Sequence, residues 1–492
     1  MRSVRAALAI LTVALLTRAA EAQVTLREVL GAALQKNPDL LAASAALEEQ
    51  RGVALSAAGI DDFILDAHLR FRADEASLLE DLFNQQPSHR ELGGDVGLVK
   101  PLPTGGNIGV RFSTNYFRDE FARLDDTGTV FTTSTSYNPA VLLTIDQPLL
   151  RGIGPTASRG LARRTRVEAD AARLARENAA ALAMREVVRA YWELRFAAES
   201  VEVSRRLAKA ARDQLEIVAA NIRAGKMPPS ASAEVEVAAG LRDEQVLFAE
   251  RSLLERSLEL RELAGLPIDA ANTVLTAADP LATEGQAGSL AEALALAEQR
   301  NPALASARQV GRAASIEVDV TDNGLLPQLD LSLVAGPTGS SNDAGEAFRQ
   351  LTSFDSFTVQ GNLTFTEPLG NRDARGRYLA ARARWRRATL DADQIALQTA
   401  SAVVRAHALT DEARRRLAVI APTSEAARLD LAAERARFEV GRATNFDVLR
   451  RQDEVADTVV RTARARADLL IAEAALWAAT GEIFEKYGVT VK

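Results

Sequence analysis

Four stretches of the chain alternate apolar and polar residues with a period of two. The clearest is residues 359–366, VQGNLTFT, in which every second residue is apolar or glycine. Residues 65–71, 141–146 and 328–333 repeat the pattern. This spacing predicts half-buried strands with one polar face. It fits a soluble antiparallel sheet and a membrane barrel with a wet lumen equally well.

A further hairpin is predicted over residues 95–112, where Thr104, Gly105 and Gly106 form the turn. With this hairpin the predicted strands number about six, which is still fewer than the roughly eight that a closed barrel needs. A membrane barrel would therefore require several chains, each contributing strands to one shared wall.

Two longer stretches, 157–222 and 374–440, are rich in Ala, Leu, Arg and Glu and contain a single proline, Pro422. At about 1.5 Å per residue each predicted helix is about 100 Å long, which indicates a coiled coil or a helical repeat. Shorter helices are predicted at 24–58, 230–264, 289–321 and 446–480. Stacked end to end in pairs, they would match the long helices. Helices of this length cannot enclose one compact core, so they would form a wall or a rod.

The helical and strand patterns occur twice along the chain. Residues 26–40, LREVLGAALQKNPDL, align with residues 290–304, LAEALALAEQRNPAL, and both contain Asn-Pro-x-Leu. The strand-ending segments LTIDQPLL and LTFTEPLG then recur in the same order. The sequence therefore predicts an internal duplication, with repeats at residues 23–280 and 281–492.

Residues 1–22 resemble an export signal, with arginines at the start, an apolar run and an Ala-Glu-Ala cleavage site. The apolar run is too short for a spanning helix, so we expect an exported mature chain from about Gln23. The 492 residues include no cysteine, which excludes disulfides, thiolate metal sites and N-terminal lipid attachment. A formal net charge of −7 makes nucleic acid an unfavourable partner.

Enzymatic chemistry requires positioned acids, bases or nucleophiles, and the chain carries no motif of a serine hydrolase, a zinc protease or a nucleotide-binding loop. The three histidines, His68, His89 and His407, are isolated in the sequence and are interpreted as structural or solvated. Residues 319–330 partly resemble a calcium loop but fit a helix end before a strand better. We therefore expect no enzyme activity, no cofactor and no metal site.

Three features together resemble the TolC-type outer-membrane efflux proteins: the duplicated Asn-Pro-x-Leu helix, the strand-ending QPLL and TEPL segments, and RFEVGRATNFDVL at 437–449. The resemblance covers residues 24–482. It implies an α+β membrane protein that forms a homotrimer. Each chain would contribute four strands to one twelve-stranded outer-membrane barrel, and long helical hairpins to a periplasmic tunnel. Residues 74–138 depart from this pattern, and the sequence leaves open whether they add strands, lengthen existing strands or fold at the outer surface.

The resemblance also assigns roles to single residues. Pro148 and Pro368 would end strands where the chain leaves the membrane, which suits a residue that donates no ladder hydrogen bond. The periplasmic tips, where the adaptor of the inner-membrane pump docks, would be Ala224, Gly225 and Lys226 in one turn and Val440, Gly441 and Arg442 in the other. In each turn the glycine suits the left-handed conformation of a helix C-cap.

The gate of this family contains aspartates, and the matching positions in this chain are Asp447 and Arg450. Three Asp447 carboxylates around a closed pore would attract cations and repel one another. Arg450 replaces the second aspartate and lies one helical turn further on, where it could pair with Asp447. The alternative interpretation of the pair is a surface salt bridge worth about 0–1 kcal/mol.

The sequence therefore indicates the outer-membrane exit duct of a tripartite efflux or type I secretion system, passive and gated. Its expected partners are a periplasmic adaptor, an inner-membrane pump and outer-membrane lipid. Two alternatives stay open. One is a heavy-metal efflux duct, and the other is a soluble periplasmic coiled-coil adaptor. An adaptor would not be expected to carry amphipathic strands at duplicated positions.

Overall fold

The computed structural model describes residues 22–490, except 78–83, 126–127, 269–272 and 283–287. The predicted export signal lies outside the described residues, apart from its last residue. The described chain divides into two compact units. Unit 1 contains the residues up to 45, residues 174–305 and the residues from 394 onward, and unit 2 contains residues 46–173 and 306–393.

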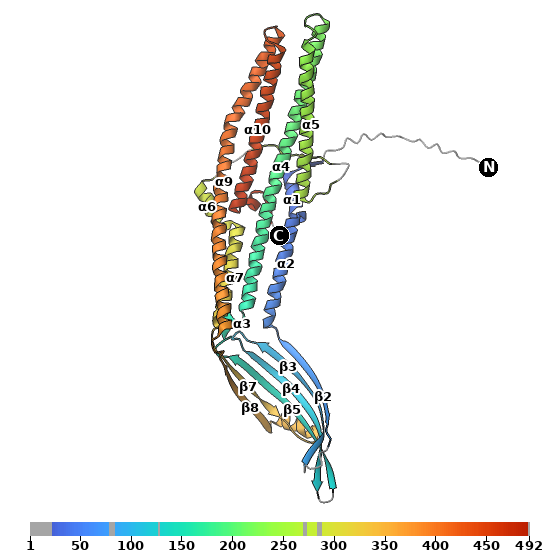
Figure 1. Ribbon diagram of the computed structural model, residues 1–492, viewed down its shortest axis with the longest axis vertical. Helices are drawn as coiled ribbons and strands as arrows, with labels where there is room; N and C mark the ends of the chain where they lie inside the picture. Colours follow the sequence, from blue (N-terminus) through green and yellow to red (C-terminus); the bar gives the residue numbers. More distant parts are fainter. Residues whose placement is uncertain (1–21, 78–83, 126–127, 269–272, 283–287, 491–492) are drawn as a thin grey trace, which may run out of the picture. The chain divides into compact units, whose positions relative to one another are not determined.

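Both predicted long helices are confirmed. They are α4 (Gly160–Arg223) and α9 (Arg372–Glu439), shown in Figure 1. Each is followed, after a turn, by a shorter helix at a predicted position, α5 (Ala231–Ala264) and α10 (Asn445–Thr480). Their abundant Ala, Leu, Arg and Glu residues have high helix propensity, which explains why the composition of these stretches predicted helices.

The predicted helices at 24–58 and 289–321 are each two helices, so this part of the prediction was wrong. The four helices are α1 (Leu26–Lys36), α2 (Pro38–Ala58), α6 (Leu290–Arg300) and α7 (Pro302–Asn323). Each break falls at the asparagine of an Asn-Pro-x-Leu motif. The residue before a proline avoids the helical conformation, and Asn37 and Asn301 have extended backbones with ψ of 124° and 119°.

The same asparagines also cap the helices that follow them. The side-chain oxygen of Asn37 accepts a hydrogen bond from the Leu40 N–H at 3.1 Å. The side-chain oxygen of Asn301 accepts one from the Leu304 N–H, also at 3.1 Å. Proline at the first helical position completes this arrangement, because its missing N–H needs no partner there. The duplicated motif is therefore a capped helix break.

Unit 2 contains an antiparallel sheet of six strands in the order β2-β3-β4-β5-β7-β8. The strands are β2 (Ile64–Glu75), β3 (Asn84–Pro101), β4 (Asn107–Asp125), β5 (Gly128–Pro148), β7 (Gln328–Thr338) and β8 (Ser356–Thr366). The four predicted strands and the predicted hairpin are all confirmed. The implied count of four strands is wrong, because residues 74–138 add β3 and β4 as full strands. They also lengthen β5, which has 21 residues where β7 and β8 have 11.

A tight turn at residues 102–106 joins β3 to β4 at the predicted place. Gly105 has a φ of +91°, which L side chains rarely adopt. A Cβ at Gly105 would lie 2.2 Å from the carbonyl oxygen of Gly152, so the close packing of this turn requires glycine. Thr104 adds two hydrogen bonds, from the Gly154 N–H to its carbonyl at 2.8 Å and from its hydroxyl to Gln147 at 2.7 Å. The turn is thus fixed to the segment that follows β5 and leads through α3 (Gly154–Ser158) into α4.

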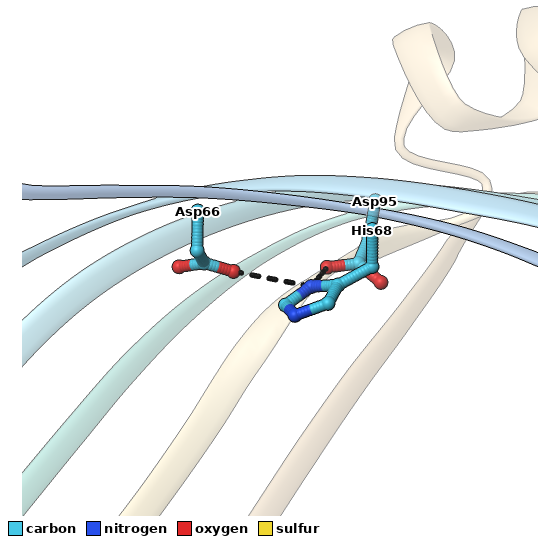
Figure 2. A group of neighbouring side chains, drawn as sticks. All are labelled: Asp66, His68 and Asp95. Carbon is cyan, nitrogen blue, oxygen red and sulfur yellow. Dashed lines mark hydrogen bonds and ion pairs between the residues drawn. The ribbon is translucent and has the colours of Figure 1, made fainter.

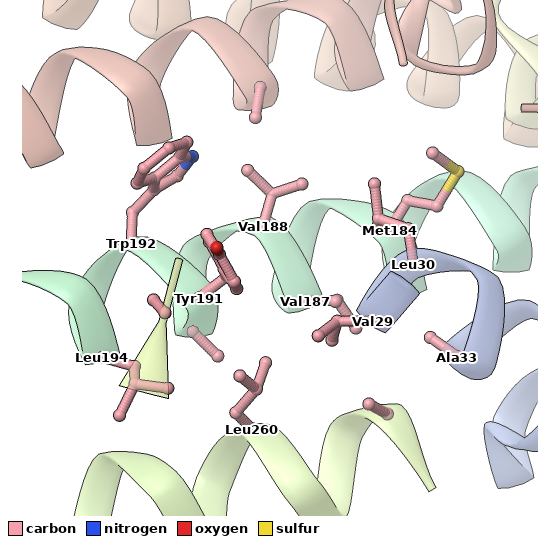
Figure 3. Close-up of a cluster of buried hydrophobic side chains, with 14 of the residues drawn as sticks. Val29, Leu30, Ala33, Met184, Val187, Val188, Tyr191, Trp192, Leu194 and Leu260 are labelled. Atoms are coloured by element: carbon pink, nitrogen blue, oxygen red, sulfur yellow. The ribbon is translucent and has the colours of Figure 1, made fainter. Parts of the chain in front are cut away.

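The larger apolar core lies in unit 1, where α1, α4 and α5 pack together (Figure 3). A short parallel pair, β1 (Ala22–Val24) and β6 (Leu275–Ala277), contributes further buried side chains. Tyr191 is fully buried in this core. Its hydroxyl donates to Asp279 Oδ2 at 2.5 Å and accepts from the Asp279 N–H at 3.1 Å, so the buried polar group is satisfied. Burial, the largest cause, and the hydrogen bond to the Asp279 carboxylate raise the pKa of Tyr191 well above its usual value.

A second, smaller core joins α6, α9 and α10. Its buried members are Ala293, Ala297, Val403, Ala406 and Leu476. Beside it, His407 occupies the position in α9 that aligns with Tyr191 in α4, but it is only half-buried. Its Nε2 lies 3.1 Å from the Gly288 carbonyl oxygen, so His407 has the structural role that the sequence predicted. The chain continues through α11 (Ile483–Lys486).

Among the described residues, no helix combines the length and the apolar composition that a membrane span requires.

Candidate functional site

The sheet of unit 2 has one apolar face and one polar face across all six strands. The register places one apolar side chain of each strand beside the next: Leu65, Leu98, Val110, Leu143, Ala335 and Val359. Much of this face is uncovered, since Leu69 is 84% exposed and Phe71 is 74% exposed. The helix α8 (Ala344–Ser353) covers part of it near Phe112, whose ring lies 6.5 Å from that of Phe348. A contiguous apolar surface of this kind marks contact with a partner or a membrane.

The edge strand β8 has the two faces that its alternation predicted. Leu363 lies opposite Leu331 of β7, whereas Thr364 lies opposite Asp330. Leu363 is 61% exposed, so nothing in the described chain buries this apolar side chain.

The polar face carries a charged cluster on β2, β3 and β4. Figure 2 shows three of its members, Asp66, His68 and Asp95. His68 Nδ1 lies 3.2 Å from Asp95 Oδ2 and 3.4 Å from Asp66 Oδ2. The guanidinium of Arg111 forms ion pairs with both carboxylates, at 2.8 Å from Asp66 and closer still to Asp95.

Two carboxylates and an imidazole are a possible ligand set for a divalent metal. In this cluster, however, the positive charge of Arg111 already contacts both carboxylates and opposes a second cation. The geometry therefore favours an ion-pair network over a metal site.

His68 and His89 are isolated in the sequence, but in the structure each lies beside an aspartate, so the prediction of isolated histidines was wrong for both. His68 contacts Asp95, and His89 Nδ1 lies 2.5 Å from Asp119 Oδ1. Each aspartate belongs to a neighbouring strand, so the contacts depend on a cross-strand register that a single sequence does not reveal.

The two prolines predicted to end strands lie at strand ends. Pro148 is the last residue of β5, and Pro368 lies two residues beyond β8. Near the first of these ends, Asp61 accepts hydrogen bonds from Arg159 through its side chain and from Lys100 through its carbonyl. The turn at 102–106 packs against the same segment, so the end of β5 is closely held.

The two predicted tip turns are equivalent helix C-caps. Gly225 and Gly441 have φ of +69° and +73°, in the left-handed region that favours glycine. The N–H of Lys226 donates to the Asn221 carbonyl at 2.9 Å, and the N–H of Arg442 donates to the Arg437 carbonyl at 2.8 Å. Both are the hydrogen bonds of a Schellman cap. The six predicted tip residues are all exposed, and they are Ala224, Gly225, Lys226, Val440, Gly441 and Arg442.

A groove of about 670 Å³ lies between the two hairpins next to these turns. Gln214 of α4, Met227 of the first turn, Phe438 of α9 and Val448 of α10 are among the residues that line it. The side-chain amide of Gln214 donates to Asn445 at the start of α10, so the two hairpins are joined at this level.

Asp447 has a structural role at the start of α10 that the resemblance did not imply. Its carboxylate accepts from the Thr444 N–H at 2.9 Å and from the Thr444 hydroxyl at 2.6 Å, while its own N–H donates to that hydroxyl oxygen at 3.2 Å. This is a capping box at the start of α10. The spacing of Thr444 and Asp447 in the sequence is the pattern that could have predicted it. The hydrogen bonds from Thr444 hold the pKa of Asp447 below its usual value, and the charge of Arg450 lowers it further. Within the described residues no ion pair joins Asp447 to Arg450.

Comparison with known proteins identifies relatives for the chain. Residues 293–482 match the family model of the outer membrane efflux proteins. Protein CyaE of Bordetella pertussis is 31% identical over 229 residues, which cover 45% of this chain and 46% of that protein. The match thus spans about half the length of this curated relative.

Several solved structures have the same fold. The outer membrane protein VceC from Vibrio cholerae is 16% identical with a TM-score of 0.63, over 93% of this chain and 96% of that chain. The CmeC outer membrane channel of Campylobacter jejuni is 13% identical with a TM-score of 0.64, over 93% and 86%. The outer-membrane channel OprN is 15% identical with a TM-score of 0.64, over 93% and 90%. The long helices and the strands of this chain therefore form the fold of outer-membrane channels.

Proposed function

Because the chain belongs to the TolC-type outer-membrane efflux protein family, we propose that it is the outer-membrane duct of an export system. The duct is passive and gated, and it leads from the periplasm to the exterior. The observation that carries this proposal is the two-faced sheet. Its exposed apolar face suits lipid, and its charged and hydroxyl-bearing face suits a water-filled lumen.

The sheet also supports a homotrimer. Within the described residues, β2 and β8 each have a neighbouring strand on one side only. Unpaired strand edges cannot face lipid, because their N–H and C=O groups would lose hydrogen bonds there. Six strands are too few to close a wall, so copies of the chain must share one. The helical part of each chain then lies in the periplasm.

The exposed tip turns are the surface that suits a periplasmic adaptor of an inner-membrane pump. Both turns present a rigid glycine-capped backbone and a cationic residue, Lys226 or Arg442, in the same geometry. Asp447 and Arg450 lie just beyond the second turn, where charged side chains of three chains would surround a constriction. Pro148 and Pro368 mark where the strands leave the membrane on the periplasmic side.

The transported substrate could be a small molecule, a metal ion or a secreted protein. A duct that binds soft metal ions would benefit from thiolate and thioether ligands, and this chain has no cysteine and three methionines.

A soluble periplasmic adaptor is disfavoured by the extent of uncovered apolar surface on the sheet.

The test is to purify the full chain in mild detergent after separation of inner and outer membranes. We expect it in the outer-membrane fraction, with a mass of three copies, and with stepwise conductance in a planar bilayer. A well-folded monomer recovered in aqueous periplasmic extract would overturn the proposal and favour the adaptor.

A further inference from the structure

The strand count of this chain differs from the count that its family resemblance implied. The additional hairpin, β3 and β4, lies inside the sheet between β2 and β5, and it is paired on both sides: β3 with β2 over residues 88–99, and β4 with β5 over its whole length. It is therefore not an appendage at the outer end of the sheet. β2 and β5, which the four-strand pattern would make neighbours, are separated by two strands.

The additional hairpin continues both faces of the sheet. On one face Ala67 of β2 is followed by Val96, Phe112 and Val141 in β3, β4 and β5. On the other face, Asp95 and Arg111 of the hairpin form ion pairs or hydrogen bonds with side chains of β2. A hairpin with lipid on one side and water on the other needs this two-sided continuity.

The turn of the hairpin provides a second, independent observation. Residues 102–106 are hydrogen-bonded to the segment that leaves β5, and Gly105 packs there without room for a Cβ. The hairpin therefore spans the sheet to the same level at which β5 ends and the chain turns toward α4.

We infer that the edge strands β2 and β8 of three chains pair with one another to close a single wall of eighteen strands, six from each chain. The partner at each edge is a second copy of this chain. This inference rests on the proposed function, since it assumes the trimeric duct. It adds that the duct is wider at the membrane than a twelve-stranded wall would be, because barrel diameter grows with strand number.

Cysteine cross-linking can test the strand order, because the native chain has no cysteine. A disulfide needs Cα atoms about 4.4–6.8 Å apart, which neighbouring strands provide and strands further apart do not. In the purified trimer, Ala67→Cys with Val96→Cys reports on β2 beside β3, and Phe112→Cys with Val141→Cys reports on β4 beside β5. Ala67→Cys with Val141→Cys forms a disulfide only if β2 lies directly beside β5.

The edge contact is tested by a single cysteine at Leu69 in β2, combined in turn with cysteine at Val359, Gly361, Leu363 or Phe365 in β8. At least one combination should give covalent trimers on a denaturing gel. Leu331→Cys with Leu363→Cys is the positive control for oxidation, because β7 and β8 are neighbours in either arrangement. Each variant is first checked for trimer mass and conductance, so that a folding defect is recognised.

We expect the β2–β3 and β4–β5 pairs to cross-link within one chain, and the β2–β8 series to cross-link between chains. A β2–β5 disulfide without the other two would overturn the inference and leave the trimeric duct intact. Failure of the whole β2–β8 series, with the control oxidised, would also overturn it. Loss of the trimer in the unmodified protein would instead overturn the proposed function.

Discussion

The side-chain amide of Asn37 donates a 2.9 Å hydrogen bond to the carbonyl of Leu263, near the end of α5. Asn301 makes the same 2.9 Å bond to Ala479, near the end of α10. In each repeat this hydrogen bond forms a joint between the helix break and the C-terminal end of α5 or α10. A glycine follows each of these two helices and packs closely at the joint, since a Cβ at Gly265 would lie 2.8 Å from the Lys36 carbonyl oxygen.

Removal of either asparagine side chain should destabilise the protein. Asn37→Ala and Asn301→Ala each remove a buried amide and leave a part-buried carbonyl without its donor and a helix without its cap, so we expect a loss of about 1–3 kcal/mol in the free energy of unfolding. Thermal unfolding of the detergent-purified trimer measures the effect. The exposed neighbours Gln35 and Gln299 supply matched controls, and their alanine variants should unfold as the wild type does. Equal losses for the buried and exposed positions would contradict the role of the joint.

A charge on the apolar face should cost more than the same charge on the polar face. Leu363→Arg places a guanidinium toward lipid and should cost about 2–4 kcal/mol near mid-membrane, whereas Thr364→Arg faces the lumen and should cost far less. The yield of folded trimer in the outer membrane measures both. Similar yields for the two variants would show that this strand has no lipid face.

The ion-pair network on the polar face should affect ion selectivity. Arg111→Ala leaves Asp66 and Asp95 without their shared cation, so the reversal potential under a salt gradient should move toward cation selectivity. Arg118→Ala removes the same charge from the opposite face of the same strand and is the matched control. A larger shift for Arg118→Ala than for Arg111→Ala would mean that the faces are assigned the wrong way round.

Removing either charged residue just after the second tip turn should shift ion selectivity, and the two removals should shift it in opposite directions. Asp447→Ala leaves the positive charges of Arg450 and Arg451 nearby in each chain and should shift selectivity toward anions, while Arg450→Ala should shift it toward cations. Both variants should raise conductance if these residues also hold the tip closed. Single-channel recording of each purified variant measures both properties. Reversal potentials identical to wild type in both variants would remove these residues from the constriction.

The capping box of Asp447 should make the start of α10 sensitive to acid. The pKa of Asp447 is lower in the folded chain than in the unfolded chain, chiefly through its hydrogen bonds with Thr444. The stabilisation is therefore present above the unfolded pKa and is lost as pH falls through the folded pKa. Hydrogen exchange of the first turn of α10 should be slower in wild type than in Asp447→Ala at neutral pH. The difference should start to shrink as pH falls below the usual Asp pKa of about 3.9, and it should vanish below the lowered pKa of the folded chain. A constant difference between pH 7 and pH 3 would contradict this.

Periodicity explains why the sequence predicted most of the fold. The long helices and the strand β8 have strong local patterns, and the turn at 102–106 contains adjacent glycines. The helix breaks were missed because the continuous apolar spacing on both sides of Asn37 and Asn301 masked the effect of the proline that follows each of them. The hairpin was predicted, but the full length of β3 could not be, because Gly93, Gly94 and Gly97 interrupt its alternation.

The candidate site was less predictable than the fold. The contacts of His68 with Asp95, and of Arg111 with Asp66 and Asp95, join strands through a register that depends on turn lengths. Asp447 was placed by family resemblance, and its bond to Thr444 went unnoticed although the spacing of a capping box was present. Resemblance assigned Asp447 to a gate, which stays a prediction, whereas the hydrogen bonds show that its side chain caps α10.

The two long helices, α4 and α9, are anchored unequally. The α4–α5 hairpin is rooted in the larger core, with Tyr191 fully buried and doubly bonded to Asp279. Among the described residues, α9 contributes buried side chains to the smaller alanine-rich core alone and carries the half-exposed His407, whereas α10 contributes to both cores. Less buried surface therefore holds α9 than α4, so α9 should be the more mobile of the two long helices. Movement at the tip turns should begin at Gly441, next to the end of α9, while Gly225, next to the end of α4, stays in place.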